Sequence, residues 1–200
     1  MRIDILPIGQ FDENSYVLHD RGHVLLIDPG RHPALIMKKI DKDEKTDAVV
    51  LTHGHCDHTG AADDIAEAYD CPIFLHPQDW ILVQKNPYGR SYEQPIYRPL
   101  SELKEGKQTI GSFKVEIIHT PGHTAGSILL RYRDVLFTGD TLFAGDIGRT
   151  DLFSGSEEQM IDSLKMIASM SGDLTIYPGH GPQSTLQQEK KTNPYLAQYL

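Results

Sequence analysis

The amino-acid sequence predicts an α/β (α+β) fold, in which short strands alternate with helices. Short apolar runs bounded by Gly, Pro and Asn recur along the chain, and this pattern is typical of strands. Segments with apolar residues at helical spacing lie between several of these runs. The chain has 200 residues, and 39% of them are hydrophobic. This length is enough to bury a full core but too short for two ordinary domains. We therefore expect one domain spanning residues 1–200.

Three strands are expected at the start of the chain, over residues 2–8, 14–20 and 23–30. The tripeptide Asp20-Arg21-Gly22 separates the second strand from the third and fits a tight hairpin turn, because Asp and Gly tolerate turn conformations. The sheet is therefore expected to begin with antiparallel strands.

Helices and strands are expected to alternate from residue 32 onward. The predicted elements are a helix over 32–44, a buried strand over 47–53, a helix over 60–69 and a strand over 73–75. The segment 86–99 is rich in Pro and Tyr, and we interpret it as a loop able to border a pocket.

The second half of the chain repeats this alternation. Strands are expected over 114–118, 127–132, 135–138 and 174–177. Ser156 followed three residues later by Gln159 forms a capping-box pattern, which marks the start of a helix. Because Met160, Leu164 and Ile167 then keep one apolar stripe, we expect a helix of about 14 residues.

The charge and composition of the chain exclude several classes of partner. A formal net charge of -9 without long runs of Lys or Arg argues against a nucleic-acid partner, because phosphates require a basic face. No segment approaches the ~18 consecutive apolar residues that span a bilayer, so no membrane role is expected. A small-molecule substrate is the remaining expectation. The two cysteines and the absence of a signal-peptide pattern favour the cytoplasm, and the oligomeric state stays open.

The segment from Leu51 to Gly60 holds a dense cluster of metal-binding residue types, directly after a buried strand and before a helix. These residues are His53, His55, Asp57 and His58. A turn at this position can direct several side chains at one point. Imidazole suits zinc and iron, and a carboxylate offsets the charge of the cation. The density of donors favours a metal site over a polar loop with surface histidines.

Three further candidates follow strand ends much later in the chain, namely His123, Asp140 and His180. Each is flanked by Gly or Pro, and glycine permits sharp turns and close backbone approach. Taken alone, each is more readily explained as an ordinary loop residue. Taken with the first cluster, the three residues indicate ligands gathered at one edge of a sheet.

The ordered motifs THGHCDH, PGHT, GD and PGHG resemble the signature of the metallo-β-lactamase superfamily, and the resemblance spans residues 51–181. The blocks HTPGHTAGS and FTGDTLFAGDIGRTD are most similar to the type-two glyoxalases (hydroxyacylglutathione hydrolases) and their short bacterial relatives. The resemblance implies an αββα sandwich with a metal site at one edge of the two sheets. It also implies two divalent metal ions, with zinc as the expected metal and iron or manganese as alternatives.

The same resemblance assigns a role to each candidate ligand. One metal is held by three histidines, the second by a mixed group, and one aspartate bridges them. The implied sets are His53, His55 and His123, then Asp57, His58 and His180, with Asp140 as the bridge. The implied nucleophile is a hydroxide held between the metals, and Asp57 and Asp140 are the catalytic residues among its ligands.

General chemistry supports this site. Two divalent cations about 3.5–4 Å apart lower the pKa of a bridging water toward neutrality and polarise a substrate carbonyl. Attack on a thioester or ester gives an oxyanion that a metal stabilises, so no Ser or Cys nucleophile is needed. Asp57 and Asp140 also balance charge, because neutral imidazoles alone would leave the cations strongly positive. The expected activity is hydrolysis of a small acyl thioester.

Arg149 and Asp151 follow Asp140 closely enough to reach the mouth of the site. We expect them to bind substrate, with an exposed ion pair as the alternative. Full-length type-two glyoxalases, which the metal-binding motifs resemble, present a Lys and a Tyr to glutathione in this region and add a C-terminal helical domain. Arg149 can replace the cation, but Asp151 cannot replace the phenol, and this chain ends at Leu200. The thiol carrier therefore stays open.

Four other residues stand at no ligand position of the motifs, and simpler roles compete with a role in the site. Asp28 ends a strand near the expected site, where a hydrogen bond to a ligand competes with a turn role. His76 and His119 lie outside the motifs and are expected to be structural or surface groups. Cys56 lies between ligands but not at a ligand position, so we expect a small side chain, with metal contact or oxidation as the alternative.

A persulfide dioxygenase is the main alternative function, because these single-iron enzymes have a similar fold and a similar GRTD stretch. Its matching ligands would be His53, His123 and Asp140. A lactone hydrolase is a further alternative, since a lactone is also an activated acyl centre. The complete set of ligands for a second metal favours hydrolysis, and it argues against a metal-binding protein without activity.

Overall fold

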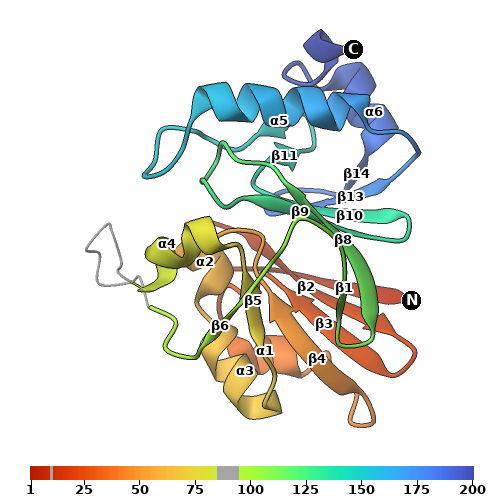
Figure 1. Cartoon of the computed structure of the whole chain (residues 1–200). Coiled ribbons are helices and arrows are strands. Elements are labelled where there is room, and N and C mark those ends of the chain that lie inside the picture. The colour runs from red at the N-terminus through yellow and green to blue at the C-terminus, as the bar shows by residue number, and fades with distance from the viewer. Residues whose placement is uncertain (10, 85–94) are drawn as a thin grey trace.

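Two six-stranded sheets pack face to face in the computed structural model, and helices cover the outer face of each sheet (Figure 1). The structure describes residues 1–9, 11–84 and 95–200. This order of layers confirms the αββα sandwich that the sequence resemblance implies.

The first sheet has the strand order β1-β2-β3-β4-β5-β6, with antiparallel pairing up to β3 and parallel pairing after it. Its strands are β1 Arg2–Ile8, β2 Glu13–Asp20, β3 His23–Ile27, β4 Lys45–Val50, β5 Ile73–Leu75 and β6 Leu100–Glu102. Arg21 and Gly22 have φ values of 53° and 76°, as a two-residue hairpin turn requires. The expected antiparallel start is therefore confirmed.

The second sheet has the strand order β14-β13-β10-β9-β8-β7, and only its β10–β13 pair is parallel. Its strands are β7 Gly106–Ile110, β8 Phe113–His119, β9 Ile128–Tyr132, β10 Val135–Gly139, β13 Thr175–Pro178 and β14 Ser184–Thr185. A small two-stranded sheet of β11 Leu142–Phe143 and β12 Asp146–Ile147 follows β10.

Helices α1 and α3 lie against the first sheet, whereas α5 and α6 lie against the second (Figure 1). The helices are α1 Pro33–Met37, α2 Cys56–Thr59, α3 Ala62–Tyr69, α4 Trp80–Gln84, α5 Glu157–Ser169 and α6 Leu186–Thr192. Two 3-10 turns complete the described elements, η1 Pro77–Asp79 and η2 Ala197–Tyr199.

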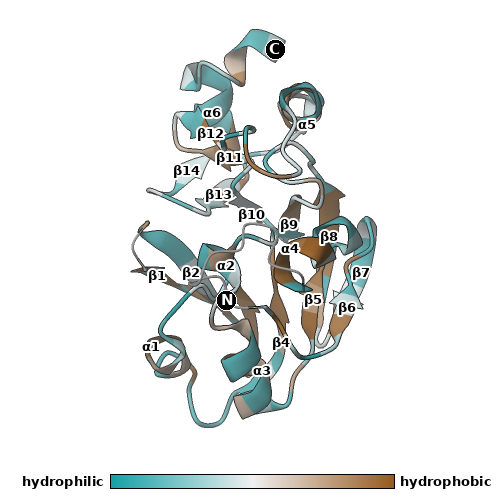
Figure 2. Ribbon diagram, turned by 90° about the vertical axis from the view of Figure 1, so that its left-hand side faces the viewer, coloured by the Kyte–Doolittle hydropathy of each residue, from teal (hydrophilic) through white to brown (hydrophobic). Residues whose placement is uncertain are grey.

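Alternating side chains let each sheet contribute to two apolar layers. Val24 and Leu26 of β3 pack with α1 and α3, whereas Leu25 and Ile27 of the same strand pack between the sheets. A third layer joins the second sheet to α5 and α6, and it includes Leu129, Leu136, Leu164, Ile176 and Leu186. Figure 2 shows the hydrophobic strands in the middle of the molecule, beneath more hydrophilic outer elements.

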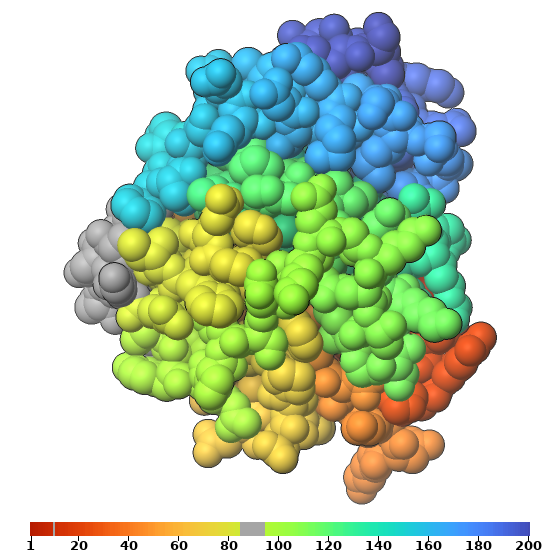
Figure 3. Space-filling view, in the orientation of Figure 1, coloured from red at the N-terminus to blue at the C-terminus, as the bar shows by residue number. Residues whose placement is uncertain are grey.

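The chain builds the two sheets one after the other. Residues 2–102 supply the first sheet and residues 106–185 the second. The surface in Figure 3 accordingly changes from red and yellow in the N-terminal half to green and blue in the C-terminal half. Any site that lies between the two sheets therefore draws residues from both halves of the sequence.

The helix predicted over 32–44 is too long, because α1 spans only Pro33–Met37. Ile36 is fully buried, whereas Leu35 is 47% exposed. The following stretch is mostly charged and has no apolar stripe to bury. The strands predicted over 23–30 and 47–53 also end early, at Ile27 and Val50, where the chain turns toward the candidate site.

Several weakly patterned segments differ from the prediction or were not predicted. Of the expected loop over 86–99, residues 86–94 lie outside the described residues, and residues 95–99 form neither helix nor strand. Strands β6, β7 and β14 were not predicted, because they are short or mostly polar. Their pairing depends on neighbouring strands more than on a local apolar pattern.

The predicted start of α5 at Ser156 is confirmed. Ser156 Oγ accepts from Gln159 N at 3.3 Å, and the helix has 13 residues. Ser156 N donates to Gly122 O at 2.8 Å, and Ser163 Oγ donates to Pro121 O at 2.7 Å, so α5 also fixes the loop before His123. Among the described helices, none has the length and apolar character to cross a membrane.

Candidate metal centre

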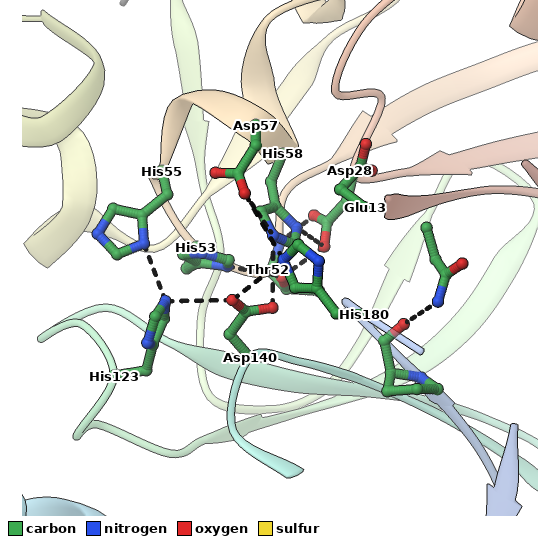
Figure 4. A network of polar contacts seen from close by, with 12 residues as sticks. Glu13, Asp28, Thr52, His53, His55, Asp57, His58, His123, Asp140 and His180 are labelled. Carbon is green, nitrogen blue, oxygen red and sulfur yellow. Dashed lines mark hydrogen bonds and ion pairs between the residues drawn. The ribbon is translucent and has the colours of Figure 1, made fainter. Parts of the chain in front are cut away.

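All seven predicted ligands gather at one edge of the sandwich, where strand ends from both sheets meet (Figure 4). They come from the loop after β4 with helix α2, from the β8–β9 loop, and from the ends of β10 and β13. Carboxyl ends of strands are common ligand sites in α/β sheets. The structure therefore brings together residues that lie up to 127 positions apart, between His53 and His180.

Three histidines form a buried group on one side of the site. Donor atoms of His53, His55 and His123 lie within 4.8 Å of one another. His55 Nδ1 lies 2.8 Å from His123 Nε2, and the His53 ring centroid lies 4.8 Å from that of His123. Three imidazoles around one point are a common ligand set of catalytic zinc.

A second group of three donors lies on the other side and nearer to solvent. Donor atoms of Asp57, His58 and His180 also lie within 4.8 Å of one another. His58 is fully buried, whereas the side chains of His180 and Asp57 are 25% and 22% exposed. This mixed set of imidazole and carboxylate is again suited to a divalent cation.

Asp140 lies between the two groups. Its Oδ2 atom is 3.4 Å from His123 Nε2 and 3.5 Å from His180 Nε2, and its Oδ1 atom is 3.3 Å from His58 Nε2. One carboxylate therefore contacts both donor groups, as a bridging ligand must.

Three buried polar atoms in the donor cluster indicate whether its residues fit metal ions. Within the described part of the chain, His53 Nε2, His58 Nε2 and Asp140 Oδ1 have no hydrogen-bond partner. Buried polar atoms nearly always have one. Cations among these atoms would satisfy all three, so the donor set fits metal ions.

Oxygen atoms outside the cluster hold three of the imidazoles by their Nδ1 atoms. The pairs are His58 Nδ1 with Asp28 Oδ2 at 3.0 Å, His123 Nδ1 with Arg149 O at 2.7 Å and His180 Nδ1 with Phe11 O at 3.0 Å. In each ring this bond places the proton on Nδ1 and turns Nε2 toward the site, which is the usual arrangement of metal-binding histidines.

Asp28 combines the two roles that the sequence left open. Its carboxylate accepts from Thr52 N at 2.7 Å and from Thr52 Oγ1 at 2.6 Å, in addition to His58. Its φ of 48° also makes it a turn residue at the end of β3. Asp28 therefore fixes the start of the ligand loop and orients one imidazole.

Burial keeps part of the site neutral. It lowers the pKa of His53 well below its usual value, with His58 adding to the effect. It also lowers the pKa of His55 to about 3, where His123 is the next cause. Both imidazoles are neutral at pH 7, and each offers a lone pair to a metal.

The carboxylates concentrate negative charge on the same site. Burial opposes their ionisation, but His58 holds the pKa of Asp140 well below its usual range and that of Asp57 at about 2. Against burial, these carboxylates raise the pKa of His58 well above its usual value and that of His180 to about 10. The site thus attracts positive charge, which protons supply when a divalent cation does not.

Glu13 and Asn14 contribute to this region, although the sequence did not single them out. Asn14 Nδ2 donates to Pro178 O at 3.0 Å and to Gly181 O at 2.8 Å, so it fixes the loop that carries His180. Glu13 is 1% exposed, and burial raises its pKa to about 9. The available signal was the run of polar residues from Glu13 to Ser15, directly before the apolar residues of β2.

Arg149 and Asp151 form an exposed ion pair beside this cluster. Arg149 Nε lies 2.7 Å from Asp151 Oδ1, and the two side chains are 61% and 66% exposed. The main-chain carbonyl of Arg149 is the part that contacts a predicted ligand, His123. The structure thus shows the ion pair that sequence analysis treated as the alternative, and their contact with a substrate stays a proposal.

His76 and His119, which were expected to be structural or surface groups, lie outside the donor cluster, whereas Cys56 lies between two of its members in the sequence. The rings of His76 and His119 stack at 4.3 Å, and burial together with His119 lowers the pKa of His76 to about 4. His119 Nε2 lies 2.8 Å from Ala125 O. In the described residues, Cys56 and Cys71 form no disulfide. The stacking of the two rings and the bond to Ala125 O therefore fit a structural role for His76 and His119.

Fold and donor set together define a protein that binds metal ions at the edge of an αββα sandwich. The chain belongs to the metallo-β-lactamase superfamily, whose family model matches residues 8–180. It is 34% identical to hydroxyacylglutathione hydrolase GloC of Haemophilus influenzae over 208 residues, which cover 98% of each chain.

Two solved structures are similar to this chain over nearly its whole length. The crystal structure of BLEG-1 B3 metallo-β-lactamase is similar with a TM-score of 0.89 and 31% identity, over 98% of this chain and 99% of the other. TTHA1623 in a di-iron-bound form is similar with a TM-score of 0.86 and 33% identity, over 96% and 100% of the two chains. These relations and the donor set place the protein among the metal-dependent hydrolases of the superfamily.

Proposed function

We propose that the protein hydrolyses small acyl thioesters with the help of two divalent metal ions. The observation that carries this proposal is the position of Asp140, which contacts both groups of three donors. In this proposal the first ion is held by His53, His55 and His123, the second by Asp57, His58 and His180, and Asp140 is shared. A shared carboxylate with two such groups is more than a single-metal site requires.

Two bound ions would supply a water-derived nucleophile at neutral pH and polarise a substrate carbonyl. The chain contributes the geometry and the charge for this chemistry. Asp57 and Asp140 bring negative charge, and Asp28 keeps the His58 ring in one orientation. We propose zinc as the natural metal, because it suits sites rich in imidazole, with iron and manganese as the other outcomes of metal analysis.

We propose a thioester as the substrate class because the similar GloC is named a hydroxyacylglutathione hydrolase. The test compares thioesters of glutathione, coenzyme A and simpler thiols, beginning with S-lactoylglutathione, and includes a lactone and a β-lactam. We expect a thioester to be hydrolysed with the highest kcat/KM. Hydrolysis of the β-lactam alone would contradict the thioester proposal. A persulfide that drives oxygen uptake by iron-loaded protein, with all esters inert, would show that the reaction class is wrong.

Arg149→Ala tests whether the exposed ion pair at the mouth contacts substrate. The variant keeps the carbonyl that accepts from His123, so the metal centre is preserved. We expect KM to rise several-fold while kcat and metal content stay unchanged, because uniform binding is lost. The matched control is Lys165→Ala, since Lys165 forms a similarly exposed pair with Asp162 on α5. If KM is unchanged in both variants, Arg149 forms only a surface ion pair and does not contact the substrate.

We also propose that the substrate is a small molecule met in the cytoplasm. The net charge of -9 supports the small-molecule substrate, because an acidic chain has little attraction for nucleic acids or anionic membranes.

A further inference from the structure

Asp79 is a buried carboxylate that the proposed chemistry does not use. It is the last residue of η1, the 3-10 helix that follows β5 after His76, and is 0% exposed. Oδ2 accepts from Gly54 N at 2.8 Å and from Thr124 Oγ1 at 2.6 Å, whereas Oδ1 accepts from Gly126 N at 2.7 Å. All of these partners are donors, so the acceptor-only form of the carboxylate satisfies each of them.

The partners of Asp79 belong to the two loops that carry the three-histidine group. Gly54 lies between His53 and His55, and Thr124 directly follows His123. The first loop continues from the first sheet and the second loop joins two strands of the second sheet. One carboxylate therefore ties together segments of two sheets that must meet around one metal ion.

Two glycines of these loops pack closely against Asp79. A Cβ atom at Gly126 would lie 2.7 Å from Asp79 Cγ, and one at Gly54 would lie 3.0 Å from Asp79 O. Real Cβ atoms rarely approach so closely, so glycine is needed at both positions. Asp79 N in turn donates to His76 O at 3.0 Å, and this bond links the main chain of Asp79 to the residue after β5.

Side-chain contacts on the second loop extend the same network. Thr124 N donates to Ser127 Oγ at 3.1 Å, and the two hydroxyl oxygens lie 2.7 Å apart. The chain after His123 is thus held by the Asp79 carboxylate and by its own turn. These two loops place His55 Nδ1 and His123 Nε2 2.8 Å apart.

We propose that Asp79 is a positioning residue, which holds the His53–His55 loop and the His123 loop at the separation that one metal ion requires. The inference rests on the proposed metal centre. Asp79 contacts neither substrate nor metal in this role and acts through Gly54, Thr124 and Gly126. Networks that orient metal ligands in this way raise metal affinity about 10–100-fold.

The test measures zinc binding by competition with a chromophoric chelator, and total zinc by elemental analysis. In Asp79→Asn, an amide nitrogen would face an N–H or O–H donor, so at least one hydrogen bond is lost. We expect one of the two zinc equivalents to bind about 10–100-fold more weakly. Thr124→Val removes one hydrogen bond to the carboxylate with little change in shape. The affinity for the same zinc equivalent should fall by a smaller factor.

Asp47→Asn is the matched control. Asp47 is also a buried carboxylate of the first sheet that accepts from the main chain of a second-sheet turn, here Ser112 N at 2.6 Å. It lies near the start of β4, whereas His53 follows the end of this strand. Asp47→Asn should lower the thermal midpoint without weakening either zinc equivalent.

A second comparison assigns the effect to one donor group. In a His55→Ala background only the Asp57–His58–His180 group is complete, and Asp79→Asn should then leave zinc affinity within about twofold. In a His180→Ala background the same change should weaken zinc binding by about 10-fold or more.

The failures of the two proposals are distinguishable. Wild-type protein that binds no metal would overturn the metal centre and the role of Asp79 together. Wild-type protein with two equivalents, and Asp79→Asn with both affinities unchanged, would overturn only the role of Asp79. Equal weakening in Asp79→Asn and Asp47→Asn would also overturn it, because both carboxylates would then support the fold alone.

Discussion

Asp140→Asn is expected to release metal from both donor groups and to reduce kcat/KM by about 100-fold or more, beyond what loss of a residue that only orients a ligand costs. Asn keeps the shape of the side chain but removes its charge. Because His58 holds the pKa of Asp140 well below its usual range against the effect of burial, the carboxylate is charged at pH 7. One substitution therefore weakens two sites at once.

The effect is measured as metal equivalents per chain and as kcat/KM on the best thioester. His76→Asn is the control, because His76 stacks on His119 outside the donor cluster. It should keep both metal equivalents and nearly full activity. Equal losses in the two variants would show that the ligand assignment is wrong.

Gly179→Ala is expected to have an effect of similar size, because a methyl group at this position would enter the metal centre. Its Cβ would lie 2.1 Å from Asp140 Oδ1 and 2.8 Å from His58 Cε1. The backbone cannot easily retreat, since Gly179 N donates to Gly139 O at 2.7 Å and Gly179 O accepts from Asn14 N at 2.8 Å. The Asp140 carboxylate must therefore move, and we expect loss of metal with about 100-fold lower activity.

Gly22→Ala separates this steric effect from backbone strain. Gly22 has a φ of 76°, and no atom lies within 4 Å of the position that an alanine Cβ would occupy, so only the conformational cost remains. That cost is about 1 kcal/mol, which lowers the thermal midpoint by about 2–4 °C in a chain of this size. Metal content and activity should stay at the wild-type level. Full metal content in Gly179→Ala would contradict the proposed role of Asp140 as the shared ligand.

The candidate ligands could be predicted from the sequence because their signal is local. His53, His55, Asp57 and His58 occupy one short segment, and Asp140 directly follows the apolar strand β10. Strand ends and clustered donors are visible without knowledge of tertiary contacts. The layers of the fold followed from the family resemblance, and the alternation of strands and helices supported them.

Asn14 and Asp79, unlike Asp28, could not be predicted to fix the ligand loops, because their contacts join distant parts of the chain. Asn14 donates to Pro178 O across 164 positions, and Asp79 accepts from Gly126 N across 47. A lone Asp or Asn carries no local pattern that distinguishes such a contact from a turn. The excessive length predicted for α1 has a related cause, since burial against the sheet decides where that helix ends.

The two-metal site is tested most directly by the metal content of the purified full chain. After reconstitution with zinc or iron and removal of loosely bound ions, we predict about two metal equivalents per chain by elemental analysis, as two complete donor groups require. A content that never exceeds one equivalent, even with excess metal, would contradict the two-metal site and favour the single-iron dioxygenase.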